Sequence, residues 1–140
     1  MTMQTRDVAA IILLNKNKEV LLQKKDLGFK YWPGYWCFFG GGISGNEDPE
    51  QTICREVKEE IGYDVRTLQL FMVQEYQEEH RRGKKYIFVA PFDKRLADIR
   101  LKEGGGFAFF AFSELNTIKI IDHDHDALLS YFKEKHEKVY

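Results

Sequence analysis

The sequence predicts a single α+β domain in which helices pack against a mixed β-sheet. Its 140 residues are about the usual size of one domain. Apolar residues make up 44% of the chain, which is enough to build one core without a structural metal or disulfides. Strand-like segments are interrupted by one central helix and followed by a terminal helix, as in other α+β domains. The chain has no repeat, low-complexity tract or linker, so residues 1–140 are expected to form one domain.

The charge of the chain is close to neutral, with 21 basic and 22 acidic residues. This balance argues against bulk binding to nucleic acid or to a membrane surface. The apolar run Val8 to Leu14 is too short to span a membrane, and it lacks the flanks of a signal peptide. Cys37 and Cys54 are too few for a secreted disulfide scaffold. We interpret both as small buried hydrophobic residues and expect a cytoplasmic protein.

The N-terminal segment predicts a β-hairpin. Residues 8–14 form a continuous aliphatic run, residues 15–18 are a cluster of Asn and Lys, and residues 20–22 resume the apolar pattern. Two apolar runs around a polar turn are typical of a hairpin with one buried strand.

An aromatic loop and a glycine run follow the hairpin. Residues 28–35 are expected to form a loop around a Pro33-Gly34 turn, and residues 36–39 a short strand that continues into Gly40, Gly41 and Gly42. Three glycines remove every Cβ, so another chemical group can approach the backbone closely. The aromatic side chains can stack on a base or sugar or simply pack over the sheet. The candidates for substrate contact are Tyr31, Trp32, Trp36 and Phe39.

The central helix has clear start and stop signals. Asp48 is the expected N-cap, Pro49 takes the first helical position, and Gln51 completes a capping box. Gly62 ends the helix. The helix is therefore expected to contain about fourteen residues, near the average length.

The C-terminal half predicts further strands and a last helix. Residues 65–79 alternate between apolar and polar side chains, as a strand does, and residues 107–112 form an aromatic strand. Leu128, Leu129 and Phe132 are expected on one face of a helix over residues 122–138. The remaining expected elements are a turn over residues 81–84, a buried strand over residues 86–90 and a polar loop over residues 93–102.

Two polar clusters allow two interpretations each. The basic cluster either contacts phosphate from a hairpin tip or forms an ordinary solvated turn; it contains Arg81, Arg82, Lys84 and Lys85. His123 and His125 either bind a transition metal or belong to a helix start capped by Asp122 or Asp124.

The central helix carries three carboxylates on one face. At 100° per residue, Glu60 lies about 40° from Glu56, and Glu59 lies about 60° from it on the other side. Each like-charge pair costs a few tenths of a kcal/mol, and the helix dipole disfavours carboxylates near the C-terminus. A divalent cation reverses both effects, and Mg²⁺ or Mn²⁺ suits such oxygen ligands. The alternative is a solvated acidic face. The adjoining arc is expected to be buried and contains Ile53, Cys54, Val57 and Ile61.

Residues 41–63 resemble the Nudix box. The box has the pattern G-x5-E-x7-R-E-U-x-E-E-x-G-U, in which U is apolar, and the sequence meets every fixed position. Agreement at so many positions with fixed spacing is much more specific than a short glycine motif. The chain is therefore similar to the Nudix hydrolase superfamily, the MutT-like proteins. This resemblance implies an α/β/α sandwich with a mixed β-sheet, in which the box forms a loop, a helix and a second loop.

The resemblance also implies roles for particular residues. Arg55 resembles the residue that orients the first glutamate of the helix, and Glu59 or Glu103 resembles the general base. Glu103 is otherwise an ordinary surface loop residue. The positions that resemble structural residues of the box are Gly41, Glu47 and Gly62. Those that resemble metal ligands are the carbonyl of Gly40 and the side chains of Glu56, Glu59, Glu60 and Glu103.

The implied activity is Mg²⁺-dependent hydrolysis of a nucleoside diphosphate linked to another group, with Mn²⁺ as an alternative ion. Nucleoside triphosphates, nucleotide sugars, dinucleoside polyphosphates and ADP-ribose are the implied substrates, and a homodimer is an implied assembly. A non-catalytic nucleotide sensor on the same fold is the alternative, although such sensors often lose box glutamates and this chain keeps them all. The near-neutral charge weighs against capped RNA as the substrate.

Overall fold

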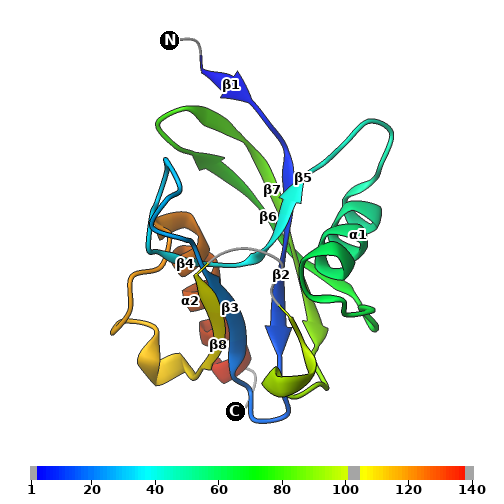
Figure 1. The fold of residues 1–140 in the computed structure, drawn as a ribbon, viewed down its shortest axis with the longest axis vertical. Coiled ribbons are helices and arrows are strands. Elements are labelled where there is room, and N and C mark those ends of the chain that lie inside the picture. The colour runs from blue at the N-terminus through cyan, green and yellow to red at the C-terminus, as the bar shows by residue number, and fades with distance from the viewer. Residues whose placement is uncertain (1–2, 101–104, 138–140) are drawn as a thin grey trace.

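The computed structural model describes residues 3–100 and 105–137 (Figure 1). A group of strands, a central helix, further strands and a last helix follow one another in the predicted order. The elements are β1 (Gln4–Thr5), β2 (Val8–Leu14), β3 (Val20–Lys24), β4 (Trp36–Cys37), β5 (Phe39–Gly42), α1 (Pro49–Ile61), β6 (Gln69–Gln77), β7 (Arg81–Pro91), the 3₁₀ turn η1 (Leu96–Asp98), β8 (Gly106–Phe110), the 3₁₀ turn η2 (Phe112–Glu114) and α2 (Asp122–Glu137).

Strand β2 lies at the centre of one mixed sheet. It pairs in parallel with β7 along its whole length. On its other edge, its first half pairs antiparallel with β5, and its last two residues pair with β3. Strands β4 and β8 extend the sheet from β3, while β1 and β6 extend it from β7. The predicted mixed sheet and the hairpin between β2 and β3 are confirmed.

The two helices cover opposite faces of this sheet. Alternate residues of β2 point to opposite sides, so Ile11 joins the core cluster of α1 while Ile12 joins that of α2. Ile53 and Val57 of α1 are fully buried in the first cluster, and Leu128 of α2 is fully buried in the second. Figure 1 shows α1 and α2 on the two sides of the strands. The α/β/α arrangement implied by the family resemblance is therefore confirmed.

Helix α1 begins and ends where the sequence predicts. Asp48 accepts a hydrogen bond from the Gln51 backbone N–H at 2.8 Å, and Gln51 returns one from the Asp48 N–H at 2.9 Å. Gly62 adopts the left-handed conformation with φ of 71°, which glycine allows without steric cost. The capping box and the glycine stop are both confirmed.

Three local predictions are wrong. The turn after β6 lies at residues 78–80, and the expected turn at 81–84 belongs to β7. The expected strand over residues 36–39 is broken at Phe38 into β4 and β5, because its two halves pair with different strands. Cys54 is exposed rather than buried, and Cys37 is half-buried. Thr52 takes the buried place beside the apolar stripe of α1.

No helix in the described ranges is long and apolar enough to cross a membrane.

Candidate functional site

Strand β5 brings two glutamates of α1 onto its glycines. The Gly40 N–H donates a hydrogen bond to Glu60 Oε1 at 3.2 Å. The Glu56 carboxylate packs against Gly41, where an added Cβ would lie 2.4 Å from Glu56 Oε1. The missing Cβ of Gly41 therefore allows the Glu56 carboxylate to approach the strand closely, while Glu60 is held by the Gly40 N–H.

Arg55 connects the glutamates of the box. Its guanidinium contacts Glu47 at 2.7 Å, Glu56 at 3.2 Å and Glu59 at 3.2 Å. Glu47 also accepts a hydrogen bond from the Thr52 hydroxyl at 3.1 Å, and this contact joins the loop to the helix. Arg55 thus contacts the first glutamate of the helix, and the roles implied for Arg55 and Glu47 stay predictions.

The electrostatic environment shifts the pKa values of Glu47 and Glu56 in opposite directions. Hydrogen bonds from Arg55 lower the pKa of Glu47 to about 2. Burial raises the pKa of Glu56 above its usual value, and although Arg55 opposes this, the nearby Glu59 and Glu47 add to it. Burial of a carboxylate among other carboxylates favours its neutral form. A bound cation would reverse this cost.

The chemistry of the donors fits a hard divalent cation. Glu56 and Glu60 present carboxylate oxygens at neighbouring glycines, and Mg²⁺ and Mn²⁺ prefer oxygen ligands. Glu59 does not join them, because its side chain is 54% exposed and pairs with Arg55. Across residues 3–100 and 105–137, no three His, Cys, Asp or Glu side chains are gathered closely enough to hold an ion. The predicted ligand Glu103 lies outside the described residues.

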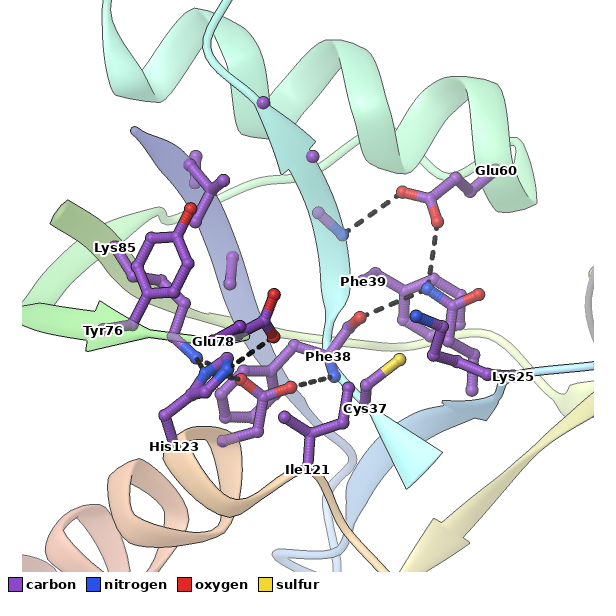
Figure 2. A pocket seen from close by; sticks show the side chains of 18 of the residues that line it. Lys25, Cys37, Phe38, Phe39, Glu60, Tyr76, Glu78, Lys85, Ile121 and His123 are labelled. Atoms are coloured by element: carbon purple, nitrogen blue, oxygen red, sulfur yellow. Dashed lines mark hydrogen bonds and ion pairs between the residues drawn. The ribbon is translucent and has the colours of Figure 1, made fainter. Parts of the chain in front are cut away.

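A pocket of about 270 Å³ opens beside Glu60 and the glycines of β5. Figure 2 shows Glu60 at one end of it and His123 at the other, with Phe38 between them. Phe38 and Ile121 give the pocket apolar walls, while Lys25 and Arg81 add positive charge. A pocket with apolar walls and a few charged groups is typical of small-molecule sites.

The far end of the pocket holds a buried chain of charged groups. Lys85 and Asp124 form an ion pair with side chains only 3% and 7% exposed. His123 contacts Asp124 at 3.4 Å and Glu78 at 2.8 Å, and Arg81 contacts Glu78 at 2.8 Å. Each carboxylate of this chain lies against a basic side chain, so each buried charge has a partner.

These contacts shift the pKa values of Glu78, Asp124 and His123. Burial alone would raise the pKa of Glu78, but hydrogen bonds from His123 and Arg81 lower it to about 2. Burial likewise opposes ionisation of Asp124, but the positive charge of Lys85 holds its pKa far below its usual value. Burial alone would lower the pKa of His123, yet its contacts with Asp124 and Glu78 raise it. Both carboxylates therefore stay ionised at neutral pH.

This network corrects two sequence interpretations. Lys85 is buried in an ion pair, so it belongs neither to a solvated turn nor to an exposed phosphate-binding tip. Asp124 binds Lys85 and the Phe38 backbone N–H rather than capping α2. Asp122 is the first helical residue and accepts from the His123 N–H at 2.7 Å. His125 lies apart from the network and contacts Asn116.

The four aromatic candidates do not form one surface. Phe39 is fully buried in the core beneath α1, so its side chain offers no surface to a ligand. Trp36 packs edge-on against Phe110. Tyr31 and Trp32 contact the turn between β6 and β7. Substrate contact by Tyr31, Trp32 and Trp36 stays a prediction, because their observed contacts are with the protein itself.

The chain is similar in sequence to a known protein family and to parts of curated proteins. The model of the family described as NUDIX domain matches residues 3–132. An 8-oxo-dGTP diphosphatase of Proteus vulgaris is 40% identical over 58 residues, which cover 41% of this chain and 51% of that protein. An RNA pyrophosphohydrolase of Blochmanniella pennsylvanica (strain BPEN) is 35% identical over 78 residues, which cover 55% of this chain and 46% of that protein. The matches thus span about half the length of these curated relatives.

Solved structures share the fold. A MutT protein from Methanosarcina mazei Go1 superposes with a TM-score of 0.84 at 14% identity, covering 96% of this chain and 98% of that one. The NUDIX domain of Shewanella oneidensis NrtR, solved with ADP ribose, superposes with a TM-score of 0.75 at 12% identity, covering 100% and 90%. Such low identities show the fold alone. With the box geometry and the family match over residues 3–132, they lead to one conclusion: the chain belongs to the NUDIX family.

Proposed function

We propose that this chain is a divalent-metal-dependent hydrolase of phosphoric anhydride bonds. Its substrate is a small molecule that contains a nucleoside diphosphate linked to another group. The observation that carries the proposal is the approach of Glu56 and Glu60 to neighbouring glycines of β5, which line a pocket with both apolar and charged side chains. The names of the Proteus vulgaris and Blochmanniella relatives, a diphosphatase and a pyrophosphohydrolase, support the same reaction class.

The box residues divide the chemical tasks. Glu56 and Glu60, with the Gly40 carbonyl, would hold Mg²⁺ or Mn²⁺, and the ion would supply neutralisation of phosphate charge and activation of water. Arg55 keeps the Glu56 carboxylate in place through its 3.2 Å contact. Glu59 is exposed and accepts the proton of the attacking water as general base. Glu103 stays the alternative base and a further ligand.

Direct attack by water needs no covalent nucleophile. Cys37 lines the pocket, but burial raises the pKa of its thiol well above the usual range. A protonated thiol is a poor nucleophile. The reaction therefore depends on positioning and electrostatics, as phosphoryl transfer commonly does.

The pocket takes the organic part of the substrate. Its apolar walls at Phe38 and Ile121 suit a flat base, while Lys25 and Arg81 suit the anionic chain attached to it. The relatives extend the range of substrates to be tested, since their names include 8-oxo-dGTP and RNA and one structural neighbour was solved with ADP ribose. The near-neutral charge of this chain favours a small nucleotide over RNA.

A substrate panel tests the proposal. Purified protein is mixed with nucleoside triphosphates including 8-oxo-dGTP, a nucleotide sugar, a dinucleoside polyphosphate, ADP-ribose and 5′-triphosphorylated RNA, each with Mg²⁺, Mn²⁺ or EDTA. We expect hydrolysis of at least one small nucleotide, faster than that of the RNA, and its loss in EDTA. Binding of ADP-ribose without turnover of any compound would instead support a nucleotide sensor.

Two glycine variants distinguish an effect on the position of the Glu56 carboxylate from an effect on the stability of the fold. The added methyl of Gly41→Ala meets the flexible end of Glu56, so we expect a folded protein whose rate falls up to about a hundredfold, the cost of a small misplacement. The added Cβ of Gly40→Ala would lie 2.2 Å from the Ala9 carbonyl oxygen, so this variant should be destabilised instead. Urea unfolding and hydrolysis rates distinguish the two effects. Equal instability of both variants would contradict this account of Gly41.

A further inference from the structure

The chain crosses from one strand partner to another at Phe38. Before it, β4 pairs with β3, and after it, β5 pairs with β2. Phe38 is only 5% exposed, and buried backbone groups outside a ladder need other partners. Its N–H donates to Asp124 Oδ2 at 3.1 Å, and its carbonyl accepts from Gln23 Nε2 at 3.2 Å. Side chains from α2 and β3 thus satisfy both backbone polar groups of this residue.

The same Gln23 amide reaches the candidate metal site. Its Nε2 donates to Glu60 Oε2 at 3.0 Å as well as to the Phe38 carbonyl. A glutamine amide carries two N–H donors, so each bond uses one of them. Glu60 Oε1 accepts a hydrogen bond from the Gly40 N–H, and dashed lines mark the contacts of the labelled Glu60 in Figure 2. Gln23 holds one oxygen of the Glu60 carboxylate and Gly40 holds the other, which fixes the carboxylate against β5.

The Asp124 end of this series of hydrogen bonds is held in place by an ion pair. Asp124, which holds the Phe38 N–H, is itself buried against Lys85 of β7. A buried ion pair restricts the positions of both side chains, because losing the contact would leave an uncompensated charge. A continuous path of contacts therefore leads from α2 through Asp124, Phe38 and Gln23 to Glu60 on α1.

We propose that Gln23 is a positioning residue of the metal site, which fixes the Glu60 carboxylate, while Asp124 fixes the backbone of Phe38, whose carbonyl Gln23 also binds. The inference rests on the proposed function, because it treats Glu60 as a ligand. Partners that hold a ligating side chain change metal affinity by about 10- to 100-fold when they are removed. A glutamine that only satisfied the Phe38 carbonyl would affect stability and leave metal affinity unchanged.

The test uses Gln23→Met, with Gln74→Met as its matched control. Methionine keeps the length of the side chain and removes the amide. Gln74 is also a half-buried strand glutamine whose amide donates to a backbone carbonyl, that of His123 at 2.8 Å. The two variants thus lose a similar backbone contact, but only Gln23→Met loses a contact with Glu60. Gln23→Ala removes the same donors without bulk and replaces Gln23→Met if that variant does not fold.

Mn²⁺ is titrated into each protein without substrate, and free Mn²⁺ is followed by electron paramagnetic resonance. We expect Gln23→Met to weaken Mn²⁺ binding about tenfold, and Gln74→Met to stay within about twofold of the wild type. Urea unfolding measures stability in parallel. Wild-type Mn²⁺ affinity in a folded Gln23 variant would overturn the proposal, as would equal weakening in both variants.

The same titration separates this proposal from the proposed hydrolysis. If the wild type turned over no substrate yet Gln23→Met still weakened Mn²⁺ binding, the positioning role would stand and the hydrolase function would fall. If the wild type hydrolysed a nucleotide while Glu60→Gln bound Mn²⁺ as tightly as the wild type, the positioning role would fall and the hydrolase function would stand.

Discussion

The Glu60→Gln variant is expected to keep its fold and to lose about a thousandfold in kcat, since a divalent ion supplies several kcal/mol of transition-state stabilisation and 1.36 kcal/mol is tenfold in rate. The substitution keeps the shape of the side chain and removes its negative charge. The oxygen of the new amide can still accept one of the two hydrogen bonds that Gly40 and Gln23 give to Glu60. The other donor then faces the new amide nitrogen, so the free energy of unfolding should fall by about 1–3 kcal/mol, the cost of a buried donor that loses its acceptor.

Glu50→Gln is the matched control for this variant. Glu50 is an exposed glutamate in the first turn of the same helix α1, away from the glycines of β5. Rates at saturating substrate and Mg²⁺, with Mn²⁺ affinity and urea unfolding measured on the same preparations, should change in Glu60→Gln and stay near wild type in Glu50→Gln. Full activity in both Glu60→Gln and Glu59→Gln would show that the metal assignment is wrong.

The elements that the sequence predicted well are those fixed by neighbouring residues. The start of α1 depends on Asp48, Pro49 and Gln51, which lie within four positions of one another. Its stop depends on Gly62, whose left-handed φ needs no distant partner. The helical repeat predicted Glu56, Glu59 and Glu60 on one face; Glu56 and Glu60 lie against β5, while Glu59 is exposed. Local signals thus explain why the helix and its caps could be predicted.

The wrong predictions for Asp124 and Lys85 concern side chains whose contact partners lie far away in the sequence. Asp124 resembled a helix cap, because capping is its commonest local role, but its partners Lys85 and Phe38 are 39 and 86 residues away. Lys85 resembled part of a basic turn beside Arg81 and Arg82. The two-residue period of a strand nevertheless puts Lys85 on the same face as Ile87, which is fully buried. This period was the one sequence signal that could have revealed a buried lysine.

Gln23 gave no sequence signal of its role. A glutamine at the end of an apolar run is an ordinary residue for the edge of a strand. Its importance depends on the break at Phe38, which follows from strand pairing across the whole sheet. Strand pairing of this kind is decided by tertiary packing and not by the residues on either side. The network at the pocket could therefore be found only from the three-dimensional structure.

Asp124→Asn is expected to destabilise the protein by about 3–5 kcal/mol, because it leaves the buried Lys85 ammonium without its counter-charge. Lys85 is 3% exposed, so water cannot replace the lost partner. Domains of this size are stable by only about 5–15 kcal/mol. The variant should therefore unfold at much lower urea concentration than the wild type.

The double variant Lys85→Met/Asp124→Asn distinguishes a charge effect from a loss of packing. It removes both charges, and the amide oxygen introduced at position 124 can still accept the hydrogen bond that Phe38 donates to Asp124. We therefore expect the double variant to be more stable than Asp124→Asn, so that the two single losses do not add. Strict additivity in urea unfolding would mean that the ion pair contributes little. The rescued variant should also keep Mn²⁺ affinity, because the Phe38 peptide, and through it the Gln23 amide, would remain where Glu60 needs them.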